Sequence, residues 1–305
     1  MNNFTKYVAI LGRGPGRSRA LTRVEARDAF RMVLSQEADP HQIGAFLMLL
    51  RFRGEDADEI TGMVEAARET VKWEGAVDLD WPSYGAGRTR GAPWFLLSAL
   101  ALARAGVTVL MHGSNEFSSG ISVEAALECL GCQQARFTFA PLAALSPELD
   151  RLLQMRALFG LRSPVNTAAR LLDPSRAGAG VDGVFHPPYL AVHLGVAERL
   201  NRPRLLVLKG GGGEAERVPI KAGTAFLWDR AAGQSEIELA PVPGLEPLKP
   251  AEDTLSLLAA VWRGKVAPPT IIATVIATIA LGASALGWSG SIDTGERIWR
   301  DRLPV

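Results

Sequence analysis

The sequence of 305 residues contains little cysteine, and what it has does not form a metal-site pattern. Its two cysteines, Cys129 and Cys132, make a single CxxC, whereas a structural zinc site needs two further ligands close by. Residues 127–130 are mostly apolar and Gly131 follows them, so we interpret the pair as the end of a buried helix and the start of the next segment. We expect neither metal binding nor redox chemistry here.

An excess of charge of one sign is also lacking. The chain has 33 basic and 32 acidic residues, which leaves a formal net charge of +1 at pH 7. Bulk electrostatics therefore predicts neither attraction to polyanions nor repulsion from them, and any basic surface must be local. Arginine supplies most of the positive charge, and its planar fork suits bidentate contacts with carboxylates or phosphates.

Long apolar runs are absent as well. The longest, residues 270–286, reaches only about 17 residues and contains Thr, Ser and Gly, so we predict a buried C-terminal helix rather than a membrane span. Residues 1–16 lack the apolar stretch and small-residue cleavage site of a signal peptide, and we expect a cytoplasmic location. With 48% hydrophobic and 21% charged residues, the composition is that of an ordinary globular protein long enough for two folding units.

Helix-start signals dominate the first seventy residues. Three capping boxes precede apolar positions at helical spacing: Thr22 with Glu25, Asp39 with Gln42, and Asp56 with Glu59. Pro40 suits the first position of the second helix, and Gly54 marks its end. This pattern predicts a small domain of short amphipathic helices.

After residue 81 the pattern changes to alternating strands and helices. We predict strands at 107–111, 181–185 and 205–208, and helices at 95–104 and about 189–200. Such alternation is typical of an α/β fold, which binds ligands in the loops at the carboxyl ends of its strands. Residues 241–250 are rich in proline and are expected to form a surface connection.

Motifs along nearly the whole chain resemble the anthranilate phosphoribosyltransferase family, glycosyltransferase family 3. The stretches QIGAFL at 42–47 and RFRGE at 51–55 resemble its N-terminal helical domain. MHG at 111–113 followed by SSG at 118–120 resembles its KHGN…SSKSG loop, and residues 156–174 resemble its R-x-x-L-G-x-R-T-x-x-N…N-P segment.

The resemblance implies a fold of the nucleoside phosphorylase and phosphoribosyltransferase class. It consists of a helical domain at residues 1–75, joined by about residues 150–175, and an α/β domain at 76–305 with a mixed, mainly parallel sheet.

The phosphate and metal motifs depart from the family pattern. The family holds phosphoribosyl pyrophosphate on a GTGGDG loop and an N-I-S-T stretch, with two magnesium ions near a D-E pair, because backbone N–H groups cradle phosphate and magnesium neutralises the leaving group. Here the loop at 84–91 reads YGAGRTRG, which places Arg88 at the acid position, and the N-I-S-T stretch reads WFLL at 94–97. Ala215 stands at the aspartate of the D-E pair, only Glu216 matches, and Met111 replaces the lysine of KHGN.

These departures resemble a TrpD-like branch of the family, typified by YbiB, in which the fold is kept, phosphoribosyl transfer is lost and nucleic acid is bound through a basic surface. We therefore assign no catalytic residue and leave enzyme activity open. The residues expected to bind phosphate or nucleic acid are Gly85, Gly87, Arg88, Arg90, His112, Ser114, Asn115, Ser118, Ser119, Arg156, Arg162, Asn166, Arg170 and Lys209. Glu216 is kept as a weak metal ligand.

Each candidate also has a structural interpretation. The usual fate of a single arginine is a solvated or carboxylate-paired side chain. His112 could contact a ligand or simply belong to a tight turn with Gly113, and Asn166, Ser118 and Ser119 could bind phosphate or cap the helices that follow. A second arginine set could track phosphates, although a solvated N-terminus is favoured; its members are Arg13, Arg17, Arg19, Arg23 and Arg27.

The leading hypothesis is non-specific binding of nucleic acid, DNA or RNA, or of a small phosphorylated ligand, by a homodimer formed through the N-terminal helical domain and without membrane association. No cofactor is expected. The alternative is a working pentosyltransferase that uses phosphoribosyl pyrophosphate with anthranilate or a related acceptor, or phosphate with a nucleoside. Arg156 would then orient the acceptor carboxylate, as the resemblance implies, and magnesium would be required. A scaffold that binds a protein partner is the third possibility.

Overall fold

The computed structural model describes residues 3–14, 16–85, 91–114, 120–131, 135–247 and 253–303, which belong to two compact units. Unit 1 comprises Met1–Glu74, Pro141–Pro174 and Ala191–Asn201. Unit 2 comprises Gly75–Ala140, Ser175–Leu190 and Arg202–Val305. The chain thus passes between the units several times, and each is described by itself.

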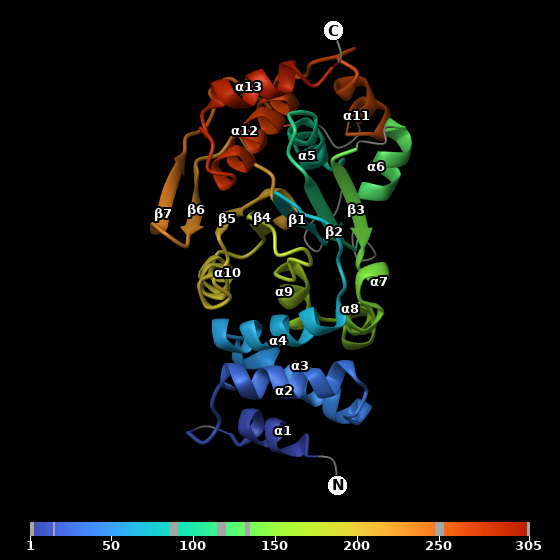
Figure 1. Ribbon diagram of the computed structural model, residues 1–305, viewed down its shortest axis with the longest axis vertical. Coiled ribbons are helices and arrows are strands. Elements are labelled where there is room, and N and C mark those ends of the chain that lie inside the picture. Colours follow the sequence, from blue (N-terminus) through green and yellow to red (C-terminus); the bar gives the residue numbers. More distant parts are fainter. Residues whose placement is uncertain are drawn as a thin grey trace. The chain divides into compact units, whose positions relative to one another are not determined.

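Unit 1 is helical (Figure 1). Its helices are α1 (Thr5–Gly12), α2 (Arg23–Leu34), α3 (Pro40–Arg53), α4 (Ala57–Thr70), α7 (Leu142–Leu145), α8 (Pro147–Phe159), α9 (Val165–Arg170) and most of α10 (Pro188–Arg199). The three predicted capping boxes at the starts of α2, α3 and α4 are confirmed, with both reciprocal contacts present in each. Local cap chemistry therefore sets where these helices begin.

Close approach of α2 and α4 depends on Gly62. A Cβ at this position would overlap the Arg23 carbonyl oxygen and lie 2.7 Å from the Arg27 nitrogen and 2.9 Å from the Ala26 Cβ. Buried apolar side chains such as Phe30 and Ile60 fill the interior of the unit. Because the helices touch backbone to backbone, their spacing leaves no room for a larger residue.

A buried ion pair also lies within unit 1. Arg68 of α4 is 3.1 Å from the Asp173 carboxylate, with 5% and 3% of the two side chains exposed. Arg68 also donates to the Leu172 carbonyl oxygen at 2.6 Å. The pair fixes the segment after α9 to α4.

Unit 2 is built on a seven-stranded sheet of order β3-β2-β1-β4-β5-β6-β7. The strands are β1 (Leu79–Ser83), β2 (Val109–Gly113), β3 (Phe137–Pro141), β4 (Ala179–Val184), β5 (Arg204–Lys209), β6 (Gly223–Asp229) and β7 (Gly233–Leu239). β1 pairs in parallel with β2 and β4, β4 pairs in parallel with β5, and β6 pairs antiparallel with β5 and β7. The predicted mixed, mainly parallel sheet is confirmed.

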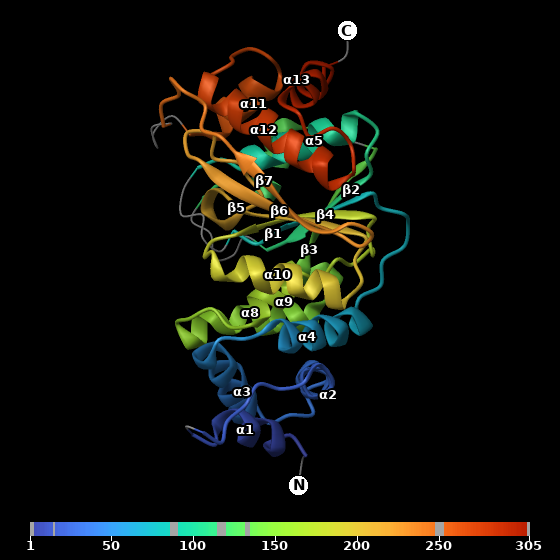
Figure 2. The ribbon, with the colours of Figure 1, turned by 90° about the vertical axis from the view of Figure 1, so that its left-hand side faces the viewer.

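Helices cover one face of this sheet (Figures 1 and 2). They include α5 (Trp94–Arg104), α12 (Pro269–Ala285) and α13 (Ile292–Arg300), with α6 (Val123–Leu130) and α11 (Leu255–Trp262) beside them. Every residue from Trp94 to Ala103 in α5 is buried, so this helix forms the centre of the core. Burying each large apolar side chain contributes about 1.5–3 kcal/mol, which explains why this mostly apolar helix is stable here.

Several boundaries differ from the prediction. The strand predicted at 107–111 runs from Val109 to Gly113, so His112 lies in the strand and not in the loop after it. The β6–β7 hairpin was not predicted, because these strands lie at the edge of the sheet, are mostly half-buried or exposed, and lack the buried apolar run by which the other strands were recognised. α6 ends at Leu130 with Gly131 in the left-handed conformation, as expected for the helix around Cys129.

The apolar run near the C-terminus forms α12, as predicted. No helix in the part of the chain that the structure describes is long and apolar enough to cross a membrane. Within unit 2, Gly282 of α12 lets this helix approach α5, because a Cβ there would lie 2.6 Å from the Leu102 side chain.

Candidate anion-binding site

Four parallel strands of unit 2, β1, β2, β4 and β5, end at one edge of the sheet. Ser83 at the end of β1 lies opposite Gly113 at the end of β2, and Val184 of β4 lies opposite Lys209 of β5. Gly113 must be glycine, since a Cβ would overlap the Ser83 carbonyl oxygen, to which Ser114 N also donates at 3.2 Å. The sheet therefore brings four of the predicted site residues of unit 2 to one edge, Gly85, His112, Ser114 and Lys209.

The loop after β5 begins with four consecutive glycines, Gly210 to Gly213. It contains the short 3-10 helix η1 (Gly211–Gly213), in which Gly212 and Gly213 have positive φ of 62° and 82°. A Cβ on Gly210 would overlap the Glu214 carbonyl oxygen, and one on Gly183 of β4 would overlap the Glu214 backbone. These glycines allow the loop to fold back against the end of β4.

Carboxylates of this chain accept hydrogen bonds from the backbone N–H groups that line this edge. Glu214 Oε1 accepts from Gly85 N at 2.6 Å, and Glu216 Oε2 accepts from Phe95 N, in the first turn of α5, at 2.9 Å. Asp253 Oδ1 accepts from Ala92 N at 2.8 Å. Free N–H groups at a glycine loop and a helix N-terminus attract anions, and here the protein supplies those anions itself.

The residues at the start of α5 are core residues. Phe95, Leu96 and Leu97 are completely buried, and Trp94 is 6% exposed. Met111 in β2 is also completely buried. Apolar side chains occupy this part of the sheet edge, so it offers few side-chain hydrogen-bond donors to a ligand.

His112 belongs to a buried polar cluster inside unit 2. Its Nδ1 is 3.0 Å from the Tyr84 hydroxyl, and its Nε2 is 3.3 Å from Asp80 Oδ1. Asp80 Oδ2 in turn accepts from Arg202 Nη2 at 3.3 Å. His112 and Asp80 have no exposed surface, which favours the structural interpretation of His112 over contact with a large ligand.

Unit 1 holds the other predicted residues. Arg156 lies in the last turn of α8 and Arg162 lies between α8 and α9; both are half-buried. Arg170, in the last turn of α9, is 7% exposed. The Asn166 Oδ1 accepts from Ser163 N at 3.3 Å, so this side chain makes a local turn contact of the capping type.

The remaining predicted site residues lie outside the described part of the chain. They are Gly87, Arg88, Arg90, Asn115, Ser118 and Ser119.

The second arginine set is largely paired with carboxylates. Arg23 is 2.5 Å from Glu65, Arg27 is 2.6 Å from Glu69, and Arg19 is 2.7 Å from Glu25. The Arg19 guanidinium, with the Thr22 N–H, lowers the pKa of Glu25 from 4.5 to about 2. Charge from these arginines is therefore compensated locally, and phosphate tracking along α2 is disfavoured.

A metal centre has little support in this geometry. Among the described residues, no group of three or more His, Cys, Asp or Glu side chains is placed to hold a metal ion. Glu216, the weak candidate ligand, directs one oxygen to the N-terminus of α5, and the neighbouring Ala215 is a buried apolar residue. These donors do not fit a magnesium site built on a carboxylate pair.

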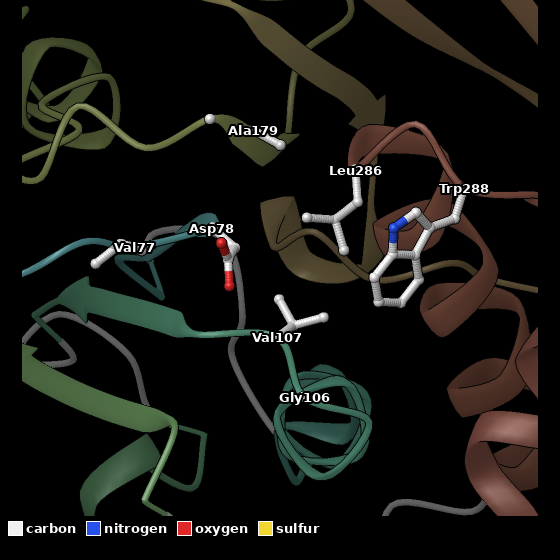
Figure 3. Close-up of a pocket in the computed structure, with 8 residues that line it drawn as sticks. Val77, Asp78, Gly106, Val107, Ala179, Leu286 and Trp288 are labelled. Carbon is white, nitrogen blue, oxygen red and sulfur yellow. The ribbon is translucent and has the colours of Figure 1, made fainter.

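A cavity of about 370 Å³ lies at the opposite edge of the sheet, at the amino ends of β1 and β4. Figure 3 shows Asp78 and Trp288 facing it from two sides, with Val107 and Leu286 between them. The Asp78 carboxylate accepts from Thr108 N at 2.7 Å. The cavity contains none of the predicted site residues.

One surface feature of the carboxyl edge was missed by the sequence prediction. Phe185 directly follows β4 and is 43% exposed, with its ring 4.8 Å from that of His186. It is therefore not the last residue of the buried strand predicted at 181–185. The Pro187-Pro188 pair directly after His186 was the available signal, because proline stops a strand and turns the chain outward.

Comparison with known proteins agrees with this architecture. Residues 6–71 match the helical bundle domain of the glycosyl transferase family. The chain is 28% identical to the uncharacterized protein YbiB of Escherichia coli K12 over 271 residues, 82% of this chain and 84% of YbiB. It is 29% identical to the anthranilate phosphoribosyltransferase of Geobacillus kaustophilus, over 93% of this chain and 90% of that enzyme.

Among solved structures, the anthranilate phosphoribosyltransferase of Thermus thermophilus superposes with a TM-score of 0.76 at 23% identity. The superposition covers 99% of this chain and 94% of the other. At this identity the likeness establishes the fold.

Proposed function

Because the chain belongs to the anthranilate phosphoribosyltransferase family, with YbiB among its relatives, we propose that it keeps the family fold but binds nucleic acid or another phosphate-rich ligand without sequence specificity. In this proposal phosphoribosyl transfer is lost or altered. The ligand lies along the carboxyl edge of the unit 2 sheet, and its phosphates are contacted by lysine and arginine side chains.

The observation that carries the proposed loss or alteration of phosphoribosyl transfer is the placement of Glu214 and Glu216. Their carboxylates accept from the N–H groups of Gly85 and Phe95, where a family enzyme would present N–H groups to pyrophosphate. A carboxylate and a phosphate oxygen compete for the same donors, and their negative charges repel each other. Binding of a pyrophosphate there would require both glutamates to move.

The apolar stretch at 94–97 supports the same conclusion. If it corresponds to the N-I-S-T motif, hydroxyl and amide donors have been exchanged for core side chains with at most 6% exposure. Restoring polar side chains at residues 94–97 would bury polar groups in the core, and each one that lacks a hydrogen-bond partner there would cost about 1–3 kcal/mol.

Nucleic acid as the ligand is supported by local charge and by the resemblance to the YbiB branch. Lys209 is exposed at the end of β5, directly before the glycine-rich loop. Arg88 and Arg90 belong to the loop of residues 84–91 and, with Lys209, are the side chains expected to contact phosphates. A chain of net charge +1 has no general attraction for polyanions, so binding depends on these few contacts.

The competing function is a pentosyltransferase with Arg156 as the acceptor ligand. Its supporting observation is the family fold itself, with the glycine-rich loops at the carboxyl edge. This function requires magnesium, and one carboxylate oxygen of Glu214 and one of Glu216 are already engaged with backbone N–H groups.

A homodimer is proposed to form through unit 1. Two exposed apolar side chains support this assignment: Phe52 on α3 is 91% exposed, and Leu158 on α8 is 80% exposed. Exposure of large apolar side chains to water costs free energy, and exposed apolar surface is typical of contact surfaces.

The decisive experiment is a titration of a fluorescent single-stranded oligonucleotide over a series of salt concentrations. Wild type, Lys209→Ala and the double variant Arg88→Ala, Arg90→Ala are compared, and Lys265→Ala serves as an exposed-lysine control. Each lost phosphate contact should lower the slope of log Kd against the logarithm of the salt concentration by about 1. The control should follow wild type.

Phosphoribosyl pyrophosphate with magnesium serves as the competitor. We expect it not to displace the oligonucleotide. Absence of oligonucleotide binding at low salt, together with tight, magnesium-dependent binding of the phosphosugar, would contradict the proposal and favour the transferase.

A further inference from the structure

The cavity at the amino edge of the unit 2 sheet is formed by four separate stretches of the chain. Its volume of about 370 Å³ lies within the range of about 300–1,000 Å³ that is typical of small-molecule sites. Of the described residues that line it, only Asp78 is charged, and apolar side chains come from Val77, Val107, Ala179 and Leu286. Apolar side chains around a single charged group suit an amphipathic ligand.

The end of α12 fixes Trp288 at the wall of this cavity. Leu286 is the C-cap of the helix, and Gly287 follows it with a φ of 81°, a conformation that favours glycine. Trp288 N then donates to the Ala283 carbonyl oxygen at 2.9 Å, which is the long hydrogen bond of a Schellman motif. The backbone therefore holds the indole beside the cavity, where Trp288 is 43% exposed (Figure 3).

Asp78 supplies a carboxylate with one oxygen available to a ligand. Its Oδ2 accepts from Thr108 N at 2.7 Å. Within the described part of the chain, the carboxylate makes no second hydrogen bond and no ion pair. A carboxylate at the wall disfavours an anionic ligand and favours a cation that donates a hydrogen bond.

Two helices add partial negative charge at this edge of the sheet. α5 ends two residues before Gly106, and α12 ends directly before Leu286. The carbonyl end of a helix carries a partial negative charge, which favours cations. Arg204 donates to two of the last carbonyl oxygens of α12 and pairs with Asp229, and Arg104 in the last turn of α5 is exposed. Each arginine offsets the partial charge of only one helix end, and the Asp78 carboxylate remains.

We propose that this cavity binds a small amphipathic organic cation, in which an ammonium group donates to Asp78 and an aromatic body packs against Leu286 and Trp288. Arylalkyl amines have this composition. The site goes beyond the proposed function, because it lies at the opposite edge of the sheet from the glycine-rich loops and shares no residue with them.

The test uses four probes that separate charge from shape. They are phenethylammonium, the neutral phenethyl alcohol, the anionic hydrocinnamate, and ethylammonium, which lacks the ring. Affinity for the full chain is measured by titration calorimetry. Fluorotryptophan labelling locates the site by fluorine NMR, with the signal of Trp288 identified by its loss in Trp288→Phe.

Three variants alter the cavity in different ways. Asp78→Asn removes the charge but keeps an oxygen for Thr108 N, and Trp288→Leu removes the aromatic face. Gly178→Leu fills the cavity, and a Cβ at Gly178 is 3.9 Å from the Asp78 carbonyl oxygen, an ordinary contact. Asp301→Asn, at an exposed position of unit 2 outside the cavity, is the control. Thermal unfolding verifies that every variant is folded.

We expect phenethylammonium to bind wild type and Asp301→Asn equally and to shift the fluorine signal of Trp288. Asp78→Asn should weaken binding about tenfold through loss of the charged hydrogen bond. Trp288→Leu should weaken it about three- to tenfold through loss of the aromatic contact. Gly178→Leu should abolish binding, and the other three probes should bind wild type at least about tenfold more weakly than phenethylammonium does.

Three results would overturn the proposal. The first is no binding of phenethylammonium to wild type, and the second is binding that leaves the Trp288 signal unchanged, which places the ligand elsewhere. The third is equal binding of phenethyl alcohol with full affinity in Asp78→Asn, which makes the cavity an apolar site without charge recognition. Oligonucleotide binding should be the same in wild type and all these variants, so this proposal and the proposed function fail independently.

Discussion

Glu216 holds the N-terminus of α5 through one carboxylate oxygen, and removing that oxygen tests what the contact does. We expect Glu216→Ala to lower the free energy of unfolding by about 1 kcal/mol, the usual cost of losing an N-terminal cap. Glu216→Gln should cost less, because an amide oxygen still accepts from Phe95 N. Urea unfolding measures both values.

The same variant should uncover an anion site. With the carboxylate gone, we expect pyrophosphate to raise the melting temperature of Glu216→Ala more than that of wild type. Glu236→Ala, at an exposed position of β7, is the matched control and should respond as wild type does. An equal response of wild type and Glu216→Ala to pyrophosphate would mean that Glu216 does not exclude anions.

Arg68 and Asp173 give a second test at this scale, on stability alone. Arg68→Met keeps the length of the side chain but leaves the Asp173 carboxylate buried without its guanidinium, and we expect a loss of about 3–5 kcal/mol in the free energy of unfolding. Asp28→Ala removes a half-exposed ion pair with Arg31 and should cost at most about 0.5 kcal/mol. Similar losses of unfolding free energy in Arg68→Met and Asp28→Ala would show that burial does not strengthen the Arg68–Asp173 ion pair.

At the scale of elements, a carboxylate shared by two arginines joins α2 to α4. Glu69 of α4 accepts from Arg31 and Arg27 of α2, and Arg31 in particular lowers the pKa of Glu69 from 4.5 to about 2. The folded state therefore binds this proton more weakly than the unfolded state does. The contribution to stability is complete above about pH 4.5 and is lost as the pH falls towards 2.

Replacing Glu69 by Gln should accordingly reduce the acid sensitivity of the protein. The free energy of unfolding is measured in urea near about pH 6 and about pH 3, and the drop between them should be smaller in Glu69→Gln than in wild type. Because the side chain is 36% exposed, solvent screening limits the effect to about 1 kcal/mol. Glu198→Gln, exposed on α10, should show the wild-type drop. If the free energy of unfolding of Glu69→Gln falls between the two pH values as much as that of wild type, Glu69 does not contribute to the acid sensitivity.

Elements with a local signal were predictable from the sequence, whereas tertiary contacts were not. The caps at Thr22, Asp39 and Asp56 and the stop at Gly131 depend on residues a few positions apart, so their spacing is visible in the chain. Only β7 has a short alternating pattern, and the β6–β7 hairpin depends on pairing with β5. Its stability comes from the sheet, and the sequence alone does not reveal it.

The candidate site shows the same division. The glycine-rich loops and Lys209 could be identified from the sequence. Glycine by its type permits close approach of the backbone, and lysine by its type carries a positive charge. The partners of Glu214 and Glu216 lie more than a hundred residues away, at Gly85 and Phe95, and no periodicity connects them. Burial of His112 depends on the length of β2 and on Tyr84, so a histidine beside a glycine was equally compatible with an exposed loop.

At the scale of the whole molecule, assembly and binding are linked through avidity. A homodimer formed by unit 1 would carry two carboxyl-edge sites, and a strand long enough to reach both would bind more tightly than either site alone allows. We expect sedimentation to give twice the chain mass of 32.6 kDa for wild type. Phe52→Glu together with Leu158→Glu should give the single-chain mass, because a charge at each exposed apolar position opposes its burial.

The monomeric variant separates site affinity from avidity. Its binding of a strand too short to span two sites should equal that of wild type, whereas its binding of a long strand should weaken by about tenfold or more. Ile292→Glu, which places a charge at an exposed apolar position of unit 2, should remain dimeric and keep the wild-type affinity for both strands. If the unit 1 variant stays dimeric, the contact lies elsewhere on the surface. If the variant becomes monomeric and keeps the wild-type affinity for the long strand, each protomer binds independently and the dimer does not contribute to binding.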